Sequence, residues 1–203
     1  MISATAIRSV RLIALADLTG GYPLRVGVDT LVSGDVAVIQ MSNVDSETGI
    51  DWPTVRRAAL PTERSSSHLK PDDIIFTTRG TRNFAIALDH IPSPAVCSPH
   101  FFVIKIKAGA GVVPAFLAWQ INQKPAQDHL RRSATGTDIL NIRRDALENL
   151  VIAVPSYARQ NAIVAFATAA AAERAAFARL VENRHQQMQA LARDLHRQER
   201  PLS

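Results

Sequence analysis

The pattern of apolar and polar positions divides the chain into two parts. Up to residue 155, short apolar and β-branched runs alternate with turns rich in Gly, Pro, Asp and Ser, which is typical of strands in a sheet. From residue 156, apolar side chains recur every three or four residues, with no Gly or Pro until Pro201. The sequence therefore predicts an α+β fold, with a mixed β-sheet domain and packed helices over residues 1–155 and a long C-terminal coiled-coil helix over residues 156–203.

The first part carries several strand-like runs and two helix-like ones. Pro114 suits the first turn of a helix, and the aromatic and aliphatic residues after it have the spacing of a helical face. A second helical segment is predicted at 126–132. Strands are predicted at 10–15, 34–41, 50–60, 74–78, 84–88, 101–107 and 147–154.

The long helix has the 3.5-residue repeat of a coiled-coil seam, and Ser156 is a suitable N-cap. At 1.5 Å per residue, about 43 residues make a rod of roughly 65 Å, longer than a compact domain of this size can cover. Alternatively, the alanine-rich part, residues 165–176, folds back along its own domain. We expect a partner helix or a second copy to contact the apolar residues Phe177, Val181, Met188, Leu191 and Leu195.

Composition narrows the class of protein. Of 203 residues, 47% are hydrophobic, which is ordinary for a folded domain with its own core. Cys97 is the sole cysteine, so no intrachain disulfide can form and a reducing cytoplasm is the expected location. Arg8 and Arg11 interrupt the N-terminal apolar residues, and no apolar run approaches the roughly 20 residues that cross a bilayer. No membrane association is expected.

A formal charge of +5 and a pI near 10.0 favour a polyanionic partner. The strand predicted at 74–78 runs directly into Arg79-Gly80-Thr81-Arg82. Guanidinium groups, hydroxyl donors and a glycine that lets the backbone approach a ligand together suit phosphate. The alternative is an ordinary solvated turn.

A second basic segment lies between residues 124 and 144. It contains five basic residues and two acidic ones, and includes Thr135-Gly136-Thr137. It could bind phosphate in the same way, or it could be the end of a helix with a solvated face. Gln40 and Asn43 lie where a predicted strand meets a polar loop; amides can pair in two places with adenine, although an Asn that simply forms the turn is the alternative.

Motifs for catalysis are missing from the sequence. There is no Gly-Lys dipeptide and hence no P-loop, and no glycine-rich or Asn/Asp-Pro-Pro-aromatic methyl-donor motif. Asp72 and Asp73 are neighbours that would point to opposite sides of a strand, and Cys97 with His100 is too small a set for zinc. We expect no catalytic residue, metal or cofactor.

Five segments, taken in order, carry a resemblance to a known family. They are GDVAVIQMSNV (34–44), LKPDDIIFTTRG (69–80), SPHFFVIK (98–105), GTDILNI (136–142) and LVIAVPSYARQNAIV (150–164). Together with the long helix, they resemble the target recognition domain of type I restriction-modification DNA specificity subunits. Such subunits usually carry two recognition domains and two helices, so this chain resembles a single-domain, half-length form.

The resemblance implies a non-catalytic, sequence-specific DNA-binding subunit of a restriction-modification or related phage-defence complex. It implies double-stranded DNA, a DNA methyltransferase subunit and a restriction or other effector subunit as partners, and a second specificity half or second copy on the helix. The alternative is a structural coiled-coil adaptor with only non-specific DNA contact. We expect phosphate contacts from Arg79, Thr81, Arg82, Thr135, Thr137 and Arg143, with Gly80 and Gly136 in the same loops, and base contacts from Gln40, Asn43, Ser66 and Asn83.

Overall fold

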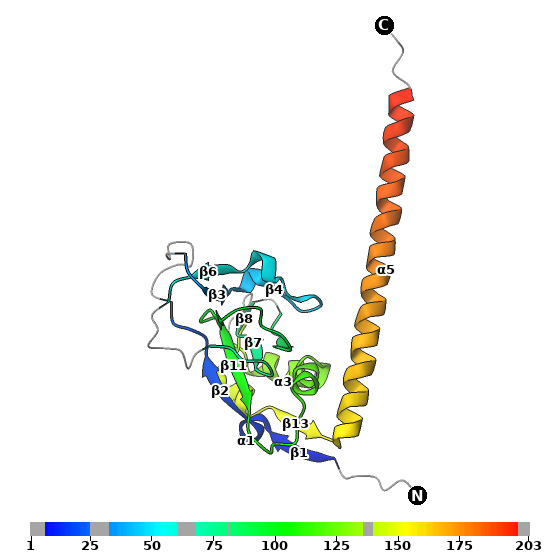
Figure 1. Cartoon of the computed structure of the whole chain (residues 1–203). Helices are drawn as coiled ribbons and strands as arrows, with labels where there is room; N and C mark the ends of the chain where they lie inside the picture. The colour runs from blue at the N-terminus through cyan, green and yellow to red at the C-terminus, as the bar shows by residue number, and fades with distance from the viewer. Residues whose placement is uncertain (1–6, 25–32, 61–67, 81, 136–139, 199–203) are drawn as a thin grey trace, which may run out of the picture. The chain divides into compact units, whose positions relative to one another are not determined.

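The computed structural model describes residues 7–24, 33–60, 68–80, 82–135 and 140–198. By contacts the chain divides into two units, Met1–Val164 and Ala165–Ser203. The first unit contains all the strands and the short helices, and the second consists of the greater part of one helix, α5 (Tyr157–Gln198) (Figure 1).

A four-stranded antiparallel sheet forms the centre of the first unit. Its order is β2 (Ala16–Gly20), β11 (Phe101–Ile106), β7 (Ile74–Thr77) and β9 (Ala85–Ala87). β11 is paired along both edges, with Phe102 opposite Gly20 on one side and opposite Phe76 on the other. The strands predicted at 74–78, 84–88 and 101–107 are confirmed.

Strand β7 is buried on both faces. Ile74 and Phe76 belong to one hydrophobic cluster and Ile75 belongs to another, because successive side chains point to opposite sides of a strand. All three are at most 1% exposed. Burial of each such side chain contributes about 1.5–3 kcal/mol, which makes β7 a firm support for the loop that follows it.

Helices cover the face of the sheet to which Ile74 and Phe76 point. They are α1 (Leu12–Leu15), α2 (Pro114–Ile121), α3 (Lys124–Ser133) and α4 (Arg144–Glu148). Phe116, Leu117 and Ile121 place the buried side of α2 in the same cluster. The helices predicted from Pro114 and at 126–132 are confirmed.

A second sheet supplies the hydrophobic cluster on the opposite face. Its order is β10 (Ala95–Cys97), β3 (Val36–Ile39) and β6 (Arg56–Ala58), with β10 parallel and β6 antiparallel to β3. In Figure 1 this sheet lies at one end of the first unit, and β1 and α1 lie at the other. Between β3 and β6 come the short 3-10 helices η2 (Met41–Asn43) and η3 (Trp52–Thr54) and the hairpin of β4 (Val44–Asp45) and β5 (Gly49–Ile50).

Three predicted strands need correction. The run at 10–15 is the end of β1 (Arg8–Arg11) followed by α1, because Leu12 and Leu15 lie three residues apart and both reach the core, as a helix requires. The run at 147–154 begins in α4 and becomes a strand only at β13 (Val151–Val154), which pairs with β1. The run at 50–60 is broken by η3, where Pro53 cannot donate a ladder hydrogen bond.

The predicted long helix is confirmed as α5, whose 42 residues span roughly 63 Å. Ser156 lies immediately before its first residue, at the predicted N-cap. Gln160, which is fully buried, attaches the first turn to the sheet domain: its side chain accepts from Val113 N at 2.8 Å and donates to Gly111 O and Pro155 O at 2.9 Å. Over the described parts of the chain, no helix is long and apolar enough to span a membrane.

Candidate nucleic-acid interface

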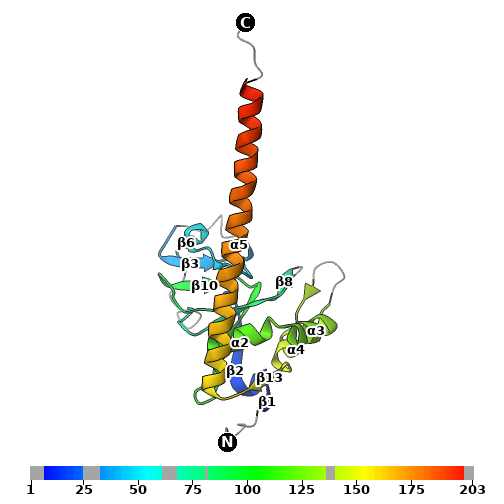
Figure 2. The same cartoon turned by 90° about the vertical axis from the view of Figure 1, so that its right-hand side faces the viewer.

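The two basic segments predicted separately from the sequence meet in the fold. β8 (Arg79–Gly80) pairs antiparallel with β12 (Leu140–Asn141), so that Arg79 lies opposite Asn141. Ile142 N donates to Thr78 O at 2.9 Å and extends this pairing by one residue. Figure 2 shows β8 on the side of the domain that carries α3 and α4. The arginine loop after β7 and the segment after α3 therefore form one surface.

The turn that begins this surface is held by its own polar groups. Thr78 donates to His100 O through both its backbone N and its hydroxyl, each at 2.9 Å. Thr77 Oγ1 accepts from Phe84 N at 2.9 Å, and Asn83 Nδ2 donates to Thr77 O at 2.9 Å. Because every one of these bonds connects to the backbone, the arginine side chains are not needed to maintain the turn.

Gly80 adopts a backbone conformation that other residues avoid. Its φ is +132°, far outside the range that L side chains favour. A Cβ placed on it would meet Arg82 O at 3.5 Å and the Met41 methyl carbon at 3.8 Å, which are ordinary contacts. The requirement for glycine thus comes from the backbone angle and not from lack of space.

Arginines on this surface differ in whether a carboxylate neutralises them. Arg79 and Arg82 are exposed and form no ion pair within the described part of the chain. Arg143 is 3.4 Å from Asp145, with both side chains mostly exposed. Arg131 lies 3.5 Å from Asp128. Arg79 and Arg82 are consequently the guanidinium groups most ready to accept a phosphate.

Asp128 is an acidic residue among the basic side chains of helix α3. Lys124 donates to it at 2.7 Å, and this hydrogen bond is the main reason that the pKa of Asp128 is lowered. Arg131 and Arg132 lower the pKa further by their charge. One carboxylate therefore faces several cations, and the end of α3 keeps a net positive charge.

A buried carboxylate, Asp73, closes the turn that leads into strand β7. Asp73 accepts from Lys70 N at 2.9 Å and lies 3.8 Å from the Lys105 ammonium group. Burial is the dominant influence and raises the pKa of Asp73 despite these partners. Asp73 closes the turn before β7, so its role is in positioning the strand that leads to Arg79.

The predicted base-contacting amides occupy different environments. Asn43 is buried; its Oδ1 accepts from Gln40 N at 2.8 Å and its Nδ2 donates to Thr54 O at 3.1 Å. Asn83 is also buried, in the turn described above. Gln40 is half-buried and lines a cleft. Ser66, Thr81, Gly136 and Thr137 lie outside the described residues, while Thr135 is exposed and bridges to Asn141.

A polar cleft that was not predicted from the sequence lies beside the arginine loop. This cleft, of about 330 Å³, is lined by Ser46, Arg82, Asn83, Phe84, Asn122, Gln127 and Arg131. Asn122 joins the helix layer to strand β9 by hydrogen bonds of 2.8 Å to both backbone groups of Ala85. The polar residues Asn122, just after α2, and Gln127, in the first turn of α3, were the signal that could have identified it.

Cys97, one of the two residues first considered for zinc, is buried and unreactive. Burial raises the pKa of the Cys97 thiol to about 12, so the thiolate is scarcely populated near neutral pH. Within the described ranges, no three His, Cys, Asp or Glu side chains are placed to hold a metal ion. The arrangement around β8 and β12 is suited to binding an anion through arginine and backbone groups.

Comparisons with known proteins give matches at the level of structure alone. No protein-family model matches, and neither does any curated protein. The S subunit of a type I restriction-modification system from M. genitalium is 16% identical, with a TM-score of 0.56, over 83% of this chain and 40% of that one. The HsdS subunit of Thermoanaerobacter tengcongensis is 21% identical, with a TM-score of 0.61, over 95% and 48%.

A third match comes from a structure described as showing complex assembly and conformational transition of the type I R-M system. It is 14% identical, with a TM-score of 0.63, over 94% of this chain and 44% of that one. At these identities the likeness establishes the fold, and the predicted α+β target recognition domain fold with a long helix is confirmed. The chain spans less than half the length of each of the three structures.

Proposed function

We propose that this chain, which has the fold of one half of a type I S subunit, is a non-catalytic DNA specificity subunit of a restriction-modification or related phage-defence complex. The observation that carries the proposal is the pairing of β8 with β12, which unites two basic segments on one surface of that fold. The sheet domain reads one half-site, and the complex includes a methyltransferase subunit and a restriction or other effector subunit.

Phosphate contacts provide the affinity in this proposal. Arg79 and Arg82 extend from a turn whose shape is fixed by hydrogen bonds to the backbone, so little backbone freedom is lost on binding. Each phosphate that such a group neutralises releases condensed counterions and contributes about 0.9 to the slope of log affinity against log salt concentration.

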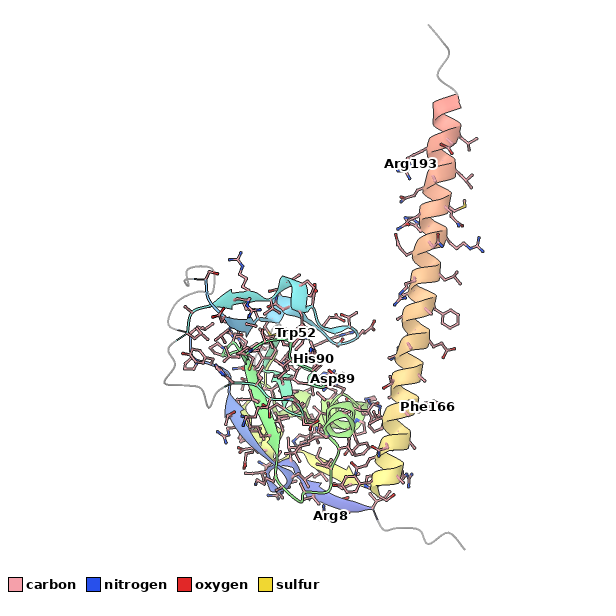
Figure 3. The ribbon with its side chains drawn as sticks, in the orientation of Figure 1. Arg8, Trp52, Asp89, His90, Phe166 and Arg193 are labelled. Atoms are coloured by element: carbon pink, nitrogen blue, oxygen red, sulfur yellow. The ribbon has the colours of Figure 1, made fainter. Side chains whose placement is uncertain are left out.

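The assembly surface in this proposal is the exposed apolar stripe on α5 formed by Phe177, Val181, Met188, Leu191 and Leu195. From residue 172 to residue 195 every side chain is exposed, and the stripe includes Phe177 at 59%, Met188 at 66% and Leu195 at 65% exposure. Figure 3 labels Phe166, 77% exposed, and Arg193 on the same helix. Apolar side chains in this number on one helix are typical of a surface that pairs with another helix.

The sizes of the seam residues favour an antiparallel partner with the same seam. Antiparallel pairing centred between Phe177 and Val181 places Ala167 opposite Leu191 and, one step further in, Ala170 opposite Met188. In these two pairs a large side chain meets a small one, which is how close-packed layers fill space, while Phe177 faces Val181. Parallel pairing would set leucine against leucine and alanine against alanine.

The same register places Arg174 of one helix opposite Arg184 of the other. Two like charges in a seam are unfavourable, and an acidic residue at either position of a different helix would remove the repulsion. The sizes of the seam residues thus favour a second copy of this chain, whereas the arginines favour a second specificity half whose seam is acidic at that point.

DNA binding is tested by the salt dependence of affinity. Fluorescence anisotropy with a duplex pool should show that Arg79→Ala lowers the salt slope by about one and weakens all sequences alike. Arg11→Ala is the matched control, since Arg11 is exposed on β1, which lies away from β8 in both views of the domain (Figures 1 and 2). Equal slopes in the two variants would remove the loop from the interface.

Selection from a random pool of duplexes distinguishes a specificity subunit from a structural adaptor. A specificity subunit should enrich particular sequences from a random duplex pool. An adaptor should bind all members of the pool equally.

A further inference from the structure

A second cleft adjoins the arginine loop, and its use rests on the proposed function. This cleft, of about 450 Å³, is lined by Leu24, Gln40, Met41, Ser42, Ser98, Pro99 and His100. It lies where strand β3 ends and where the chain turns from β10 into β11. Only Gln40 of these residues is expected from the sequence to contact DNA.

Two contacts fix the cleft beside the arginines. Thr78, the residue before Arg79, donates twice to His100 O. On the other side, the Met41 methyl carbon lies within 3.8 Å of the position that a Cβ on Gly80 would take. A nucleic acid whose phosphates lie against Arg79 therefore has its neighbouring groups at the mouth of this cleft.

Ser98 has an unusual hydroxyl. The residue is 4% exposed, and its Oγ finds no hydrogen-bond partner within the described part of the chain. Its backbone is fully engaged: Ser98 N donates to Ile39 O at 2.9 Å, and Ser98 O accepts from Phe101 N at 3.2 Å. Gly21 packs so closely that a Cβ on it would lie 2.0 Å from Ser98 O. The turn is thus held rigidly around a buried hydroxyl that has no partner within the described part of the chain, a feature that needs an explanation in a native structure.

The cleft is lined by hydrogen-bonding and apolar side chains. An amide, two hydroxyls and an imidazole line the cleft together with the thioether of Met41, and no Lys, Arg, Asp or Glu is among the lining residues. Phosphate favours cationic partners, whereas the edge of a base pair offers neutral donors, acceptors and, in thymine, a methyl group. The lining thus complements bases and leaves phosphate to the neighbouring loop.

We propose that this cleft reads the major-groove edge of an A·T base pair. The Gln40 amide pairs with adenine, for which amides are suited in two places, and Met41 packs against the thymine methyl group. The hydroxyls of Ser42 and Ser98 and the His100 ring supply further hydrogen bonds to the same pair or its neighbour. Ser42, Ser98 and His100 are then specificity-determining residues.

The test uses selection of bound duplexes from a random pool by the full chain, comparing the wild type with Gln40→Ala, Ser98→Ala and His100→Ala. The wild-type consensus should include an A·T position, and each variant should reduce the preference there by about tenfold. The salt slope should stay at the wild-type value because no phosphate contact is removed. Ser9→Ala on β1 is the matched serine control.

The Ser98→Ala variant separates a loss of base reading from a failure to fold. Replacing a buried hydroxyl that has no partner by alanine should leave thermal stability at or above that of the wild type. A wild type that selects a consensus, with all three variants keeping it unchanged, would overturn this inference and leave the proposed function standing. A wild type that selects no sequence at all would overturn both.

Discussion

Gly80→Ala tests whether the shape of the arginine turn matters for binding. With φ at +132°, alanine there is strained by about 1–3 kcal/mol, the usual cost of a residue held in such a region. The added methyl group would make only ordinary contacts, so steric overlap adds nothing to this cost. For a domain of this size, that corresponds to a fall in melting temperature of roughly 2–12 °C.

The strain can be relieved only by moving the backbone that pairs with β12. Gly80 lies opposite Leu140, so relaxation would separate the two basic segments. We therefore expect Gly80→Ala to weaken DNA binding as well as stability, even though it removes no charged group.

Gly49→Ala is the matched control for this effect. Gly49 has φ of +81° in the β4–β5 hairpin, and nothing lies within 4 Å of where its Cβ would be. It should lose a similar amount of stability in thermal unfolding and keep the wild-type DNA affinity. If both variants lose stability and both bind DNA as the wild type does, the geometry of the β8 turn is irrelevant to binding.

Three further predictions concern single groups. Because the pKa of Asp73 is raised, the native state binds the proton of this carboxyl group more tightly than the unfolded state does. Its contribution to stability is therefore present below an ordinary Asp pKa of about 3.9 and is lost as pH rises through the pKa of the folded state. Asp73→Asn should abolish that decline in urea unfolding series, and a parallel decline in wild type and variant would contradict it. Cys97, with its pKa near 12, should resist iodoacetamide at pH 8 until the protein unfolds; rapid native labelling would show that the thiol is accessible. Leu191→Asp with Leu195→Asp should convert an assembly into monomers in light scattering while the sheet domain keeps its melting transition; a monomeric wild type at high concentration would refute pairing through the stripe.

The sequence predicts those elements whose side chains carry a periodic signal. Strand β7 is recognisable because Ile74, Ile75 and Phe76 fill both faces of a sheet, and α5 is recognisable because its repeat continues without Gly or Pro. Leu12–Leu15 misleads because a four-residue apolar run suits a buried strand and one helical turn equally well.

The candidate site is less predictable because backbone groups and long-range contacts assemble it. Arg79 and Arg143 stand out by charge, but the pairing of β8 with β12 depends on backbone hydrogen bonds that no side-chain pattern encodes. Ser98 is a single serine in a turn, and its unsatisfied hydroxyl becomes visible only once Gly21 and Ile39 are in place around it. The predicted domain boundary at 155 and the predicted DNA contacts stay predictions.

The backbone pairing of β8 with β12 also determines which residues of this surface are free to vary. Because the two segments are joined through main-chain groups, the side chains at Arg79 and Asn141 can be exchanged without breaking the connection between them. The hydrophobic clusters lie behind this surface and contribute nothing to its chemistry. Variation can thus accumulate in the presented side chains while the scaffold stays constant, and libraries restricted to these short segments would sample altered anion affinity at little risk to folding.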